Sequence, residues 1–148
     1  MKKIALALML TIAVSDAQAQ EMRPLGDLLA AAPYPSTRCA GWYQALMEWG
    51  GKERLGDEAW MTMDTARRSM FLRSVLIFNQ ESGNTMETDV ELVAESARNI
   101  ADLYLLRMKN NYAAQGEAYA QDELIKGDMF ICKLVAELAV AEIGSLDQ

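Results

Sequence analysis

Apolar residues recur along most of this chain at intervals of three and four positions, which is the spacing of one face of an α-helix. After Pro35 the sequence contains no further proline, so long helices can continue without interruption. The pattern predicts a first helix over residues 37–49, which the glycine pair at 50–51 ends, and a second helix that starts after Asp57 and continues to Ser82. No segment shows the sustained alternation of polar and apolar residues that is typical of a strand.

The third predicted helix has the clearest start and the widest apolar surface. Thr88 and Glu91 have the spacing of a capping box, so the helix is expected to begin at Thr88. Leu103 and Leu106 lie beside its main apolar stripe. A helix that is apolar on more than one side lies either at the centre of a bundle or at an interface. This helix is therefore the predicted contact if the chain forms a homodimer.

The last apolar stripe runs from Tyr119 to Ile143, includes Leu138 as a predicted core residue, and contains one interruption. Gly127 is a poor helix former and Asp128 is a good N-cap residue, so a separate final helix could begin after this pair. The chain therefore predicts an all-α fold, a single small four-helix bundle, with five helices if the last one is broken at Gly127.

The two cysteines fall on the predicted buried stripes of the first and last helices. An even pair of cysteines usually forms a structural disulfide in an oxidising compartment, and two separately buried thiols are the alternative. A bond between Cys39 and Cys132 would join the first and last helices side by side. Gly41 costs about 1 kcal/mol relative to alanine inside a helix, so it predicts a close approach to a neighbouring helix.

Residues 1–19 have the layout of a cleavable secretory signal peptide. Lys2 and Lys3 precede an apolar run over residues 4–14, and small residues lead up to a cleavage point after Ala19. The apolar run is too short to span a bilayer, so we expect no stable membrane span after processing. The short basic start is typical of Gram-negative bacterial exports, and the predicted location is the periplasm.

The segment that follows the signal peptide is rich in proline. It contains Pro24, Pro33 and Pro35, so residues 20–35 are predicted to be a flexible N-terminal arm. The remaining residues, 36–148, are predicted to form the helical bundle domain.

Charge and composition exclude several classes of function. The chain has a net charge of −7 and no histidine; without its predicted signal peptide it keeps 12 basic and 20 acidic residues, a net charge of −8. All of this excess lies in residues 81–148. An acidic chain lacks the basic face that nucleic-acid binding requires. Without histidine there is no Ser-His-Asp or Cys-His catalysis, and no histidine ligand for haem or zinc.

Two groups of residues are candidates for metal or acid–base chemistry. The segment 60–63, Trp-Met-Thr-Met, is similar to the copper(I) site of small periplasmic copper carriers. Met61 and Met63, however, point about 200° apart on a helix and cannot reach one ion. The carboxylates near Asp122 and Asp128 have no special placement for general acid–base work. We therefore predict a protein that is not an enzyme and that has no cofactor and no metal site.

Aromatic and basic side chains remain as candidates for contact with a partner. The three tryptophans lie between positions 42 and 60, either as the core of a helical hairpin or as an interface patch. The arginines at 67 and 68 form either an ordinary solvated surface or a face that steers a charged partner. The candidate partner-binding residues are Trp42, Trp49, Trp60, Arg67, Arg68, Leu103 and Leu106.

The overall plan resembles two kinds of small periplasmic helical protein, toxin-immunity proteins and acid-stress chaperones. The resemblance covers architecture only. Together with the missing catalytic side chains and the charge asymmetry, it leads us to expect a non-enzymatic periplasmic interaction module: an inhibitor, an immunity protein or an adaptor for another periplasmic protein. The alternatives are a chaperone-like stress protein and a binder of a small molecule or metal in the bundle core.

Overall fold

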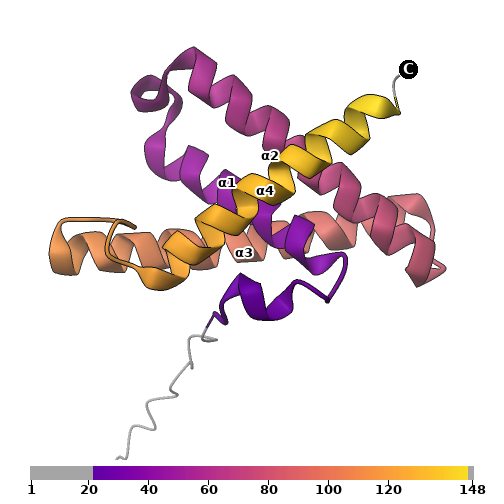
Figure 1. Ribbon diagram of the computed structural model, residues 1–148, viewed down its shortest axis with the longest axis horizontal. Helices are drawn as coiled ribbons and strands as arrows, with labels where there is room; N and C mark the ends of the chain where they lie inside the picture. The colour runs from indigo at the N-terminus through magenta and orange to yellow at the C-terminus, as the bar shows by residue number, and fades with distance from the viewer. Residues whose placement is uncertain (1–21, 147–148) are drawn as a thin grey trace, which may run out of the picture.

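The structure, a computed structural model that describes residues 22–146, is built from helices (Figure 1). They are the short 3-10 helix η1 (Leu25–Leu28) and the α-helices α1 (Tyr34–Gly50), α2 (Lys52–Ser82), α3 (Met86–Gln115) and α4 (Glu123–Ser145). Within this range the chain forms no strand. The predicted all-α bundle of four helices is confirmed, and α4 continues through Gly127 instead of dividing there.

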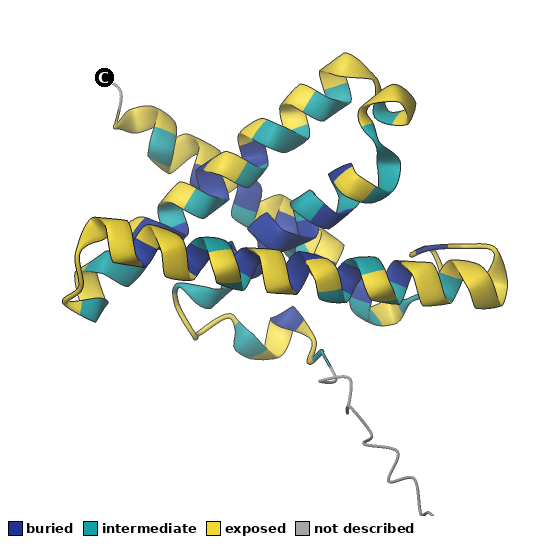
Figure 2. Cartoon of the chain, turned by 180° about the vertical axis from the view of Figure 1, so that it is seen from behind, coloured by how far each residue is buried: buried dark blue, intermediate teal, exposed yellow. Residues whose placement is uncertain are grey.

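Helix α1 lies at the centre of the bundle. It packs against α2, α3 and α4, and every residue from Ser36 to Trp42 is buried. Helix α4 crosses in front of α1 in Figure 1, whereas α3 lies in front in Figure 2, which shows the molecule from behind. Helices α3 and α4 therefore cover opposite sides of α1, so α1 is buried around its whole circumference over these residues.

The close approach predicted at Gly41 is present. A Cβ atom at this position would lie 2.6 Å from the backbone oxygen of Ala97 and 2.8 Å from Cγ2 of Ile100. Both distances are shorter than van der Waals contact, so only glycine allows α1 and α3 to pack this tightly.

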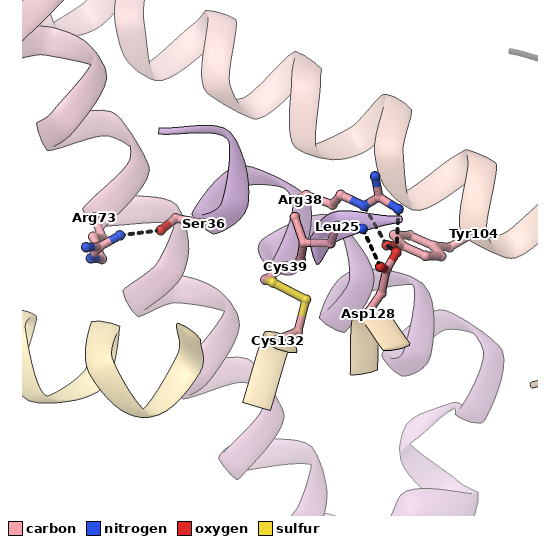
Figure 3. Close-up of a disulfide and its surroundings, with 8 residues drawn as sticks. All are labelled: Leu25, Ser36, Arg38, Cys39, Arg73, Tyr104, Asp128 and Cys132. Atoms are coloured by element: carbon pink, nitrogen blue, oxygen red, sulfur yellow. Dashed lines mark hydrogen bonds and ion pairs between the residues drawn. A yellow bond between two sulfur atoms is a disulfide. The ribbon is translucent and has the colours of Figure 1, made fainter. Parts of the chain in front are cut away.

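The predicted disulfide between the first and last helices is confirmed (Figure 3). The sulfur atoms of Cys39 and Cys132 lie 2.02 Å apart, and both residues are fully buried. The bond fixes the middle of α4 to the central helix.

Several helix ends differ from their predicted positions. Helix α1 begins at Tyr34, and α2 begins at Lys52, with a sharp kink at Gly56 just before the predicted start. Helix α3 is capped by Thr85, whose side-chain oxygen accepts the backbone N–H of Thr88 at 3.3 Å. The predicted capping box at Thr88 is wrong, because Thr88 already lies in the first turn of the helix.

Residues 20–35 were predicted to be a flexible arm, but the part that the structure describes, from residue 22 onward, packs on the bundle. It contains η1, and Leu25 of η1 is fully buried in the hydrophobic core. Its backbone N–H donates to Oδ1 of Asp128 in α4 at 2.8 Å. The buried Leu25, the partly buried Met22 and Leu28, and this backbone hydrogen bond therefore hold the segment on the bundle, which the prolines alone did not indicate.

The predicted signal peptide lies outside the described residues. Over residues 22–146, no helix is both long enough and apolar enough to cross a membrane.

Candidate functional site

A buried polar cluster links four elements at the centre of the fold (Figure 3). Arg38 of α1 donates from Nη2 to Oδ2 of Asp128 in α4, and from Nε to the hydroxyl of Tyr104 in α3 at 2.9 Å. The Tyr104 hydroxyl in turn donates to the same carboxylate at 2.6 Å. The side chains of Arg38 and Asp128 are each 1% exposed. Their charges therefore neutralise each other away from water.

The electrostatics of this cluster follow from its burial. Burial acts to lower the pKa of Arg38, but the neighbouring Tyr104 and Asp128 outweigh it and raise that pKa above its usual value. Burial also raises the pKa of Tyr104, and Asp128 adds to this shift against the opposing effect of Arg38. Arg38 stays charged and Tyr104 stays neutral at any physiological pH. The cluster holds η1, α1, α3 and α4 together and presents no titrating group to solvent.

Sequence reasoning missed this cluster. It assigned Asp128 as a helix cap and gave Arg38 no role, because an isolated arginine or aspartate is usually exposed. The available indication was that Asp128 lies four residues before Cys132 and Arg38 lies directly before Cys39, so both adjoin the predicted disulfide.

Two further carboxylates stabilise the turns between helices. Asp89 accepts hydrogen bonds from Asn79, Ser82 and Asn84, which ties the α2–α3 turn to the start of α3. Desolvation of Asp89 acts to raise its pKa, but these three donors outweigh it and lower that pKa below its usual value. These contacts are structural, because each joins one end of a helix to its neighbour.

Asp122 plays the corresponding part before α4. It caps α4 by accepting the backbone N–H groups of Leu124 and Ile125 at 3.1 Å. It also accepts from Arg107 and Asn111 of α3. Desolvation acts to raise the pKa of Asp122, and the donors, led by Arg107, outweigh it, so the pKa is lowered.

The exposed side of α4 carries large apolar side chains. Phe130 is 68% exposed, Leu134 47% and Leu138 58%. They repeat every four residues on the side of α4 opposite the buried Cys132 and Ala136. We refer to Phe130, Leu134, Leu138 and the exposed Ala141 as the α4 outer face.

Sequence reasoning did not find the α4 outer face. The predicted stripe placed Leu138 in the core, whereas it faces solvent. The indication was present, because α4 has apolar residues on two opposite sides, and only one side can face α1. The wide apolar surface was instead assigned to the third helix.

A groove borders the α4 outer face. It has a volume of 730 Å³ and lies between α2 and α4, with Tyr43 of α1 in its wall. Met61, Ala66, Ala136 and Val140 provide apolar lining. We refer to it as the α2–α4 groove. Burial raises the pKa of Tyr43, and the charge of the neighbouring Glu137, which also lines the groove, raises it further.

A second cavity, of 540 Å³, lies on the other side of the molecule between η1, α1 and α3. Arg38 contributes to its wall, together with Leu28, Ile100 and Leu103. Arg38 is already engaged by Asp128 and Tyr104, so its charge is not free to hold a second anion.

The structure does not bring the predicted partner-binding tryptophans together on one surface. Trp42 is fully buried and packs against Tyr104 with ring centroids 4.9 Å apart and the ring planes tilted by 59°, so it is a core residue. Trp49 is half-buried against Tyr112 of α3, and Trp60 is half-buried on α2. Trp42 is therefore corrected from a candidate contact to part of the core.

The other predicted contacts are also dispersed. Arg67 and Arg68 both pair with Asp64 on their own helix. Leu103 is half-buried in the wall of the second cavity, and Leu106 is 51% exposed on α3. The residues that surround Leu106 on the outer side of α3 are mostly polar, so α3 presents no continuous apolar face.

The described part of the chain contains no group of three or more His, Cys, Asp or Glu side chains placed to hold a metal ion. No protein-family model, no curated protein and no solved structure matches this chain.

Proposed function

We propose that this protein is a non-enzymatic interaction module of the periplasm that binds another protein through the α4 outer face. The observation that carries the proposal is the row of three large apolar side chains that α4 exposes over consecutive turns. A contiguous apolar patch with polar residues at its edge is typical of a protein–protein contact. The partner surface we propose is therefore apolar at its centre and carries both signs of charge at its edge.

The α4 outer face is well suited to recognition because its helix is held rigidly. The disulfide anchors the middle of α4, and the Arg38–Asp128 pair anchors its first half. A rigid helix loses little conformational entropy on binding, so more of the contact energy contributes to affinity.

Periplasmic location is part of the same proposal. The predicted signal peptide supports it, and so does the buried disulfide, since such bonds persist in oxidising compartments. Cell fractionation followed by intact-mass measurement tests it. We expect the protein in the osmotic-shock fraction, without residues 1–19 and with no free thiol. Recovery with the cytoplasmic marker protein would contradict the location.

Site-specific photocrosslinking tests the binding surface. A photoreactive phenylalanine analogue at Phe130 or Leu138 should give a protein adduct of defined mass in the native host. The same analogue at Asn99, which is exposed on the opposite side of the molecule, is the matched control and should give none. Equal adducts at all three positions, or none, would overturn the proposal.

A chaperone-like role that depends on a trigger fits this surface less well. Such a protein would keep its apolar surface covered until the trigger acts, whereas Phe130, Leu134 and Leu138 are already exposed.

The α2–α4 groove favours a second candidate function, the binding of a small apolar molecule. Its volume of 730 Å³ lies in the range of small-molecule sites, and its lining is largely apolar. It lies at the surface and not in the bundle core. Thr65→Trp would fill this groove, and Thr88→Trp on α3 is the control. A saturable fluorescent probe, anilinonaphthalene sulfonate, should bind the native protein and the control but not Thr65→Trp. Equal binding by all three would dismiss the groove as a site.

A further inference from the structure

We infer that the partner of the α4 outer face is a second copy of this chain, whose α4 packs antiparallel to the first about a twofold axis at Leu134. The inference rests on the proposed function, because it names the occupant of the same surface. It is carried by two properties of α4, the symmetric spacing of its exposed apolar side chains and the order of the charges beside them.

The apolar side chains are spaced symmetrically about Leu134. Phe130 lies four residues before it and Leu138 four residues after it. In an antiparallel pair centred on Leu134, Phe130 of one copy faces Leu138 of the other, twice, and the two Leu134 side chains meet on the axis. A twofold contact requires such a self-complementary surface, because the same patch serves both subunits.

Small residues at either end allow the two helices to approach closely. Under the same symmetry, Gly127 of one copy faces Ala141 of the other. Both are exposed and neither projects a bulky side chain. The large side chains at the centre and the small ones at the ends therefore form a continuous strip about 22 Å long on each helix.

The charges beside the strip are complementary in this orientation. Lys133 and Glu137 are both exposed and lie on the same flank of the α4 outer face, about 40° apart around the helix. A twofold axis brings that flank against itself with the chain direction reversed. Lys133 of each copy then lies within about one helical turn of Glu137 of the other, which gives two reciprocal pairs. In a parallel pair in register, Lys133 of one copy would instead lie beside the opposite flank of the partner helix, away from Glu137.

The surface is accessible to a second molecule. Helix α4 is an outer layer of the bundle, and no other described segment lies over it (Figure 1). The predicted dimer contact on the third helix lacks these properties, because Leu106 stands among polar residues there. The proposed interface therefore moves from α3 to α4.

The size of the contact sets the expected affinity. A single pair of helices over this length falls at the low end of specific interfaces, so we expect a weak dimer with a dissociation constant of roughly 10 to 100 µM. Sedimentation equilibrium over about 5 to 500 µM covers that range.

The first experiment locates the interface. Leu134→Cys is purified with the native disulfide intact and treated with a mild copper–phenanthroline oxidant, which removes two electrons as the two thiols join. We expect a covalent dimer from Leu134→Cys. Leu106→Cys is the matched control, because Leu106 is 51% exposed and Leu134 47%. We expect the control to remain monomeric.

The second experiment tests the orientation. Lys133→Glu alone and Glu137→Lys alone each replace two attractive pairs with two repulsive ones, and each should weaken the dimer about 10-fold. The double variant Lys133→Glu/Glu137→Lys restores both pairs and should associate like the native protein. Helicity by circular dichroism checks that every variant remains folded, since these residues also have i,i+4 spacing within one helix.

Each outcome decides between the two proposals. A monomer at all concentrations, with equal crosslinking of Leu134→Cys and Leu106→Cys, overturns the inference. If photocrosslinking at Phe130 still captures a different protein, the proposed function stands and only its partner was wrong. If Phe130 captures nothing, both fail. If Lys133→Glu and Glu137→Lys leave the dissociation constant of the dimer unchanged, the antiparallel orientation is wrong.

Discussion

Removing Arg38 should destabilise the fold severely, because it would leave the carboxylate of Asp128 buried without a countercharge. In the native protein each of these side chains is 1% exposed, and Arg38 donates hydrogen bonds to both Asp128 and Tyr104. The change Arg38→Met keeps most of the side-chain length and removes the charge together with these donors.

The expected loss follows from the burial of the pair. Breaking a buried ion pair by removing one partner typically costs about 3–5 kcal/mol, since one desolvated charge remains. Adding Asp128→Asn to Arg38→Met removes that charge but retains a side-chain oxygen that can accept the backbone N–H of Leu25. We expect the double variant to regain about 1–3 kcal/mol of the free energy of unfolding.

Urea unfolding at pH 7, followed by circular dichroism, measures these differences as a double-mutant cycle. Arg98→Met is the control, because Arg98 is exposed on α3, and it should change the free energy of unfolding by less than about 0.5 kcal/mol. Strictly additive effects of Arg38→Met and Asp128→Asn would refute the reasoning, since they would mean that the two charges do not stabilise each other.

Three further outcomes follow from the same structure. Gly41→Ala should lower the free energy of unfolding, measured in urea, by about 1–2 kcal/mol. The clash of the new Cβ with the backbone oxygen of Ala97 outweighs the gain in helix propensity. An increase in stability would show that α1 and α3 can move apart. Cys39→Ser should lower the free energy of unfolding by about 2–5 kcal/mol, and reduced native protein should match it; a reductant without effect on the melting temperature would contradict this. The pKa of Asp122 is lowered in the folded state, so its contribution is present above the unfolded pKa near 4 and is lost as the pH falls through the folded value. Thermal melts from pH 7 to 3 should therefore show a smaller acid-induced drop for Asp122→Asn than for the native protein, and identical drops would rule this contribution out.

The periodicity of the sequence predicted the fold because the buried positions of a bundle helix carry apolar residues at every third or fourth position. It placed Cys39 and Cys132 on facing stripes, and it marked Gly41 as a point of close approach. Each of these inferences needed only the spacing of residue types along one helix.

What the sequence did not reveal depends on where helices lie relative to one another. Arg38 and Asp128 are polar, so no periodicity argument places them in the core, and only the three-dimensional arrangement brings them together. Gly127 and Asp128 looked like a break because local propensities are weak, and packing of α4 against α1 overrides them. The capping error at Thr88 has the same origin, since Thr85 supplies an equally good cap one turn earlier.

The candidate surface was missed for a related reason. Phe130 and Leu134 are apolar, and a sequence cannot tell which of two apolar sides of a helix faces the core until the neighbouring helices are placed. The tryptophans were predicted as partner contacts because this residue type is enriched at interfaces, yet Trp42 belongs to the packed interior.

The central position of α1 also constrains how the chain can fold during synthesis. Residues 36–42 are made before α4, but one side of them is covered by α4. A ribosome-bound chain that ends before residue 123 therefore has an incomplete core and no thiol at position 132 for Cys39 to pair with. Folding of this bundle therefore requires α4, and truncation before residue 123 should abolish it rather than remove one helix from an otherwise intact domain.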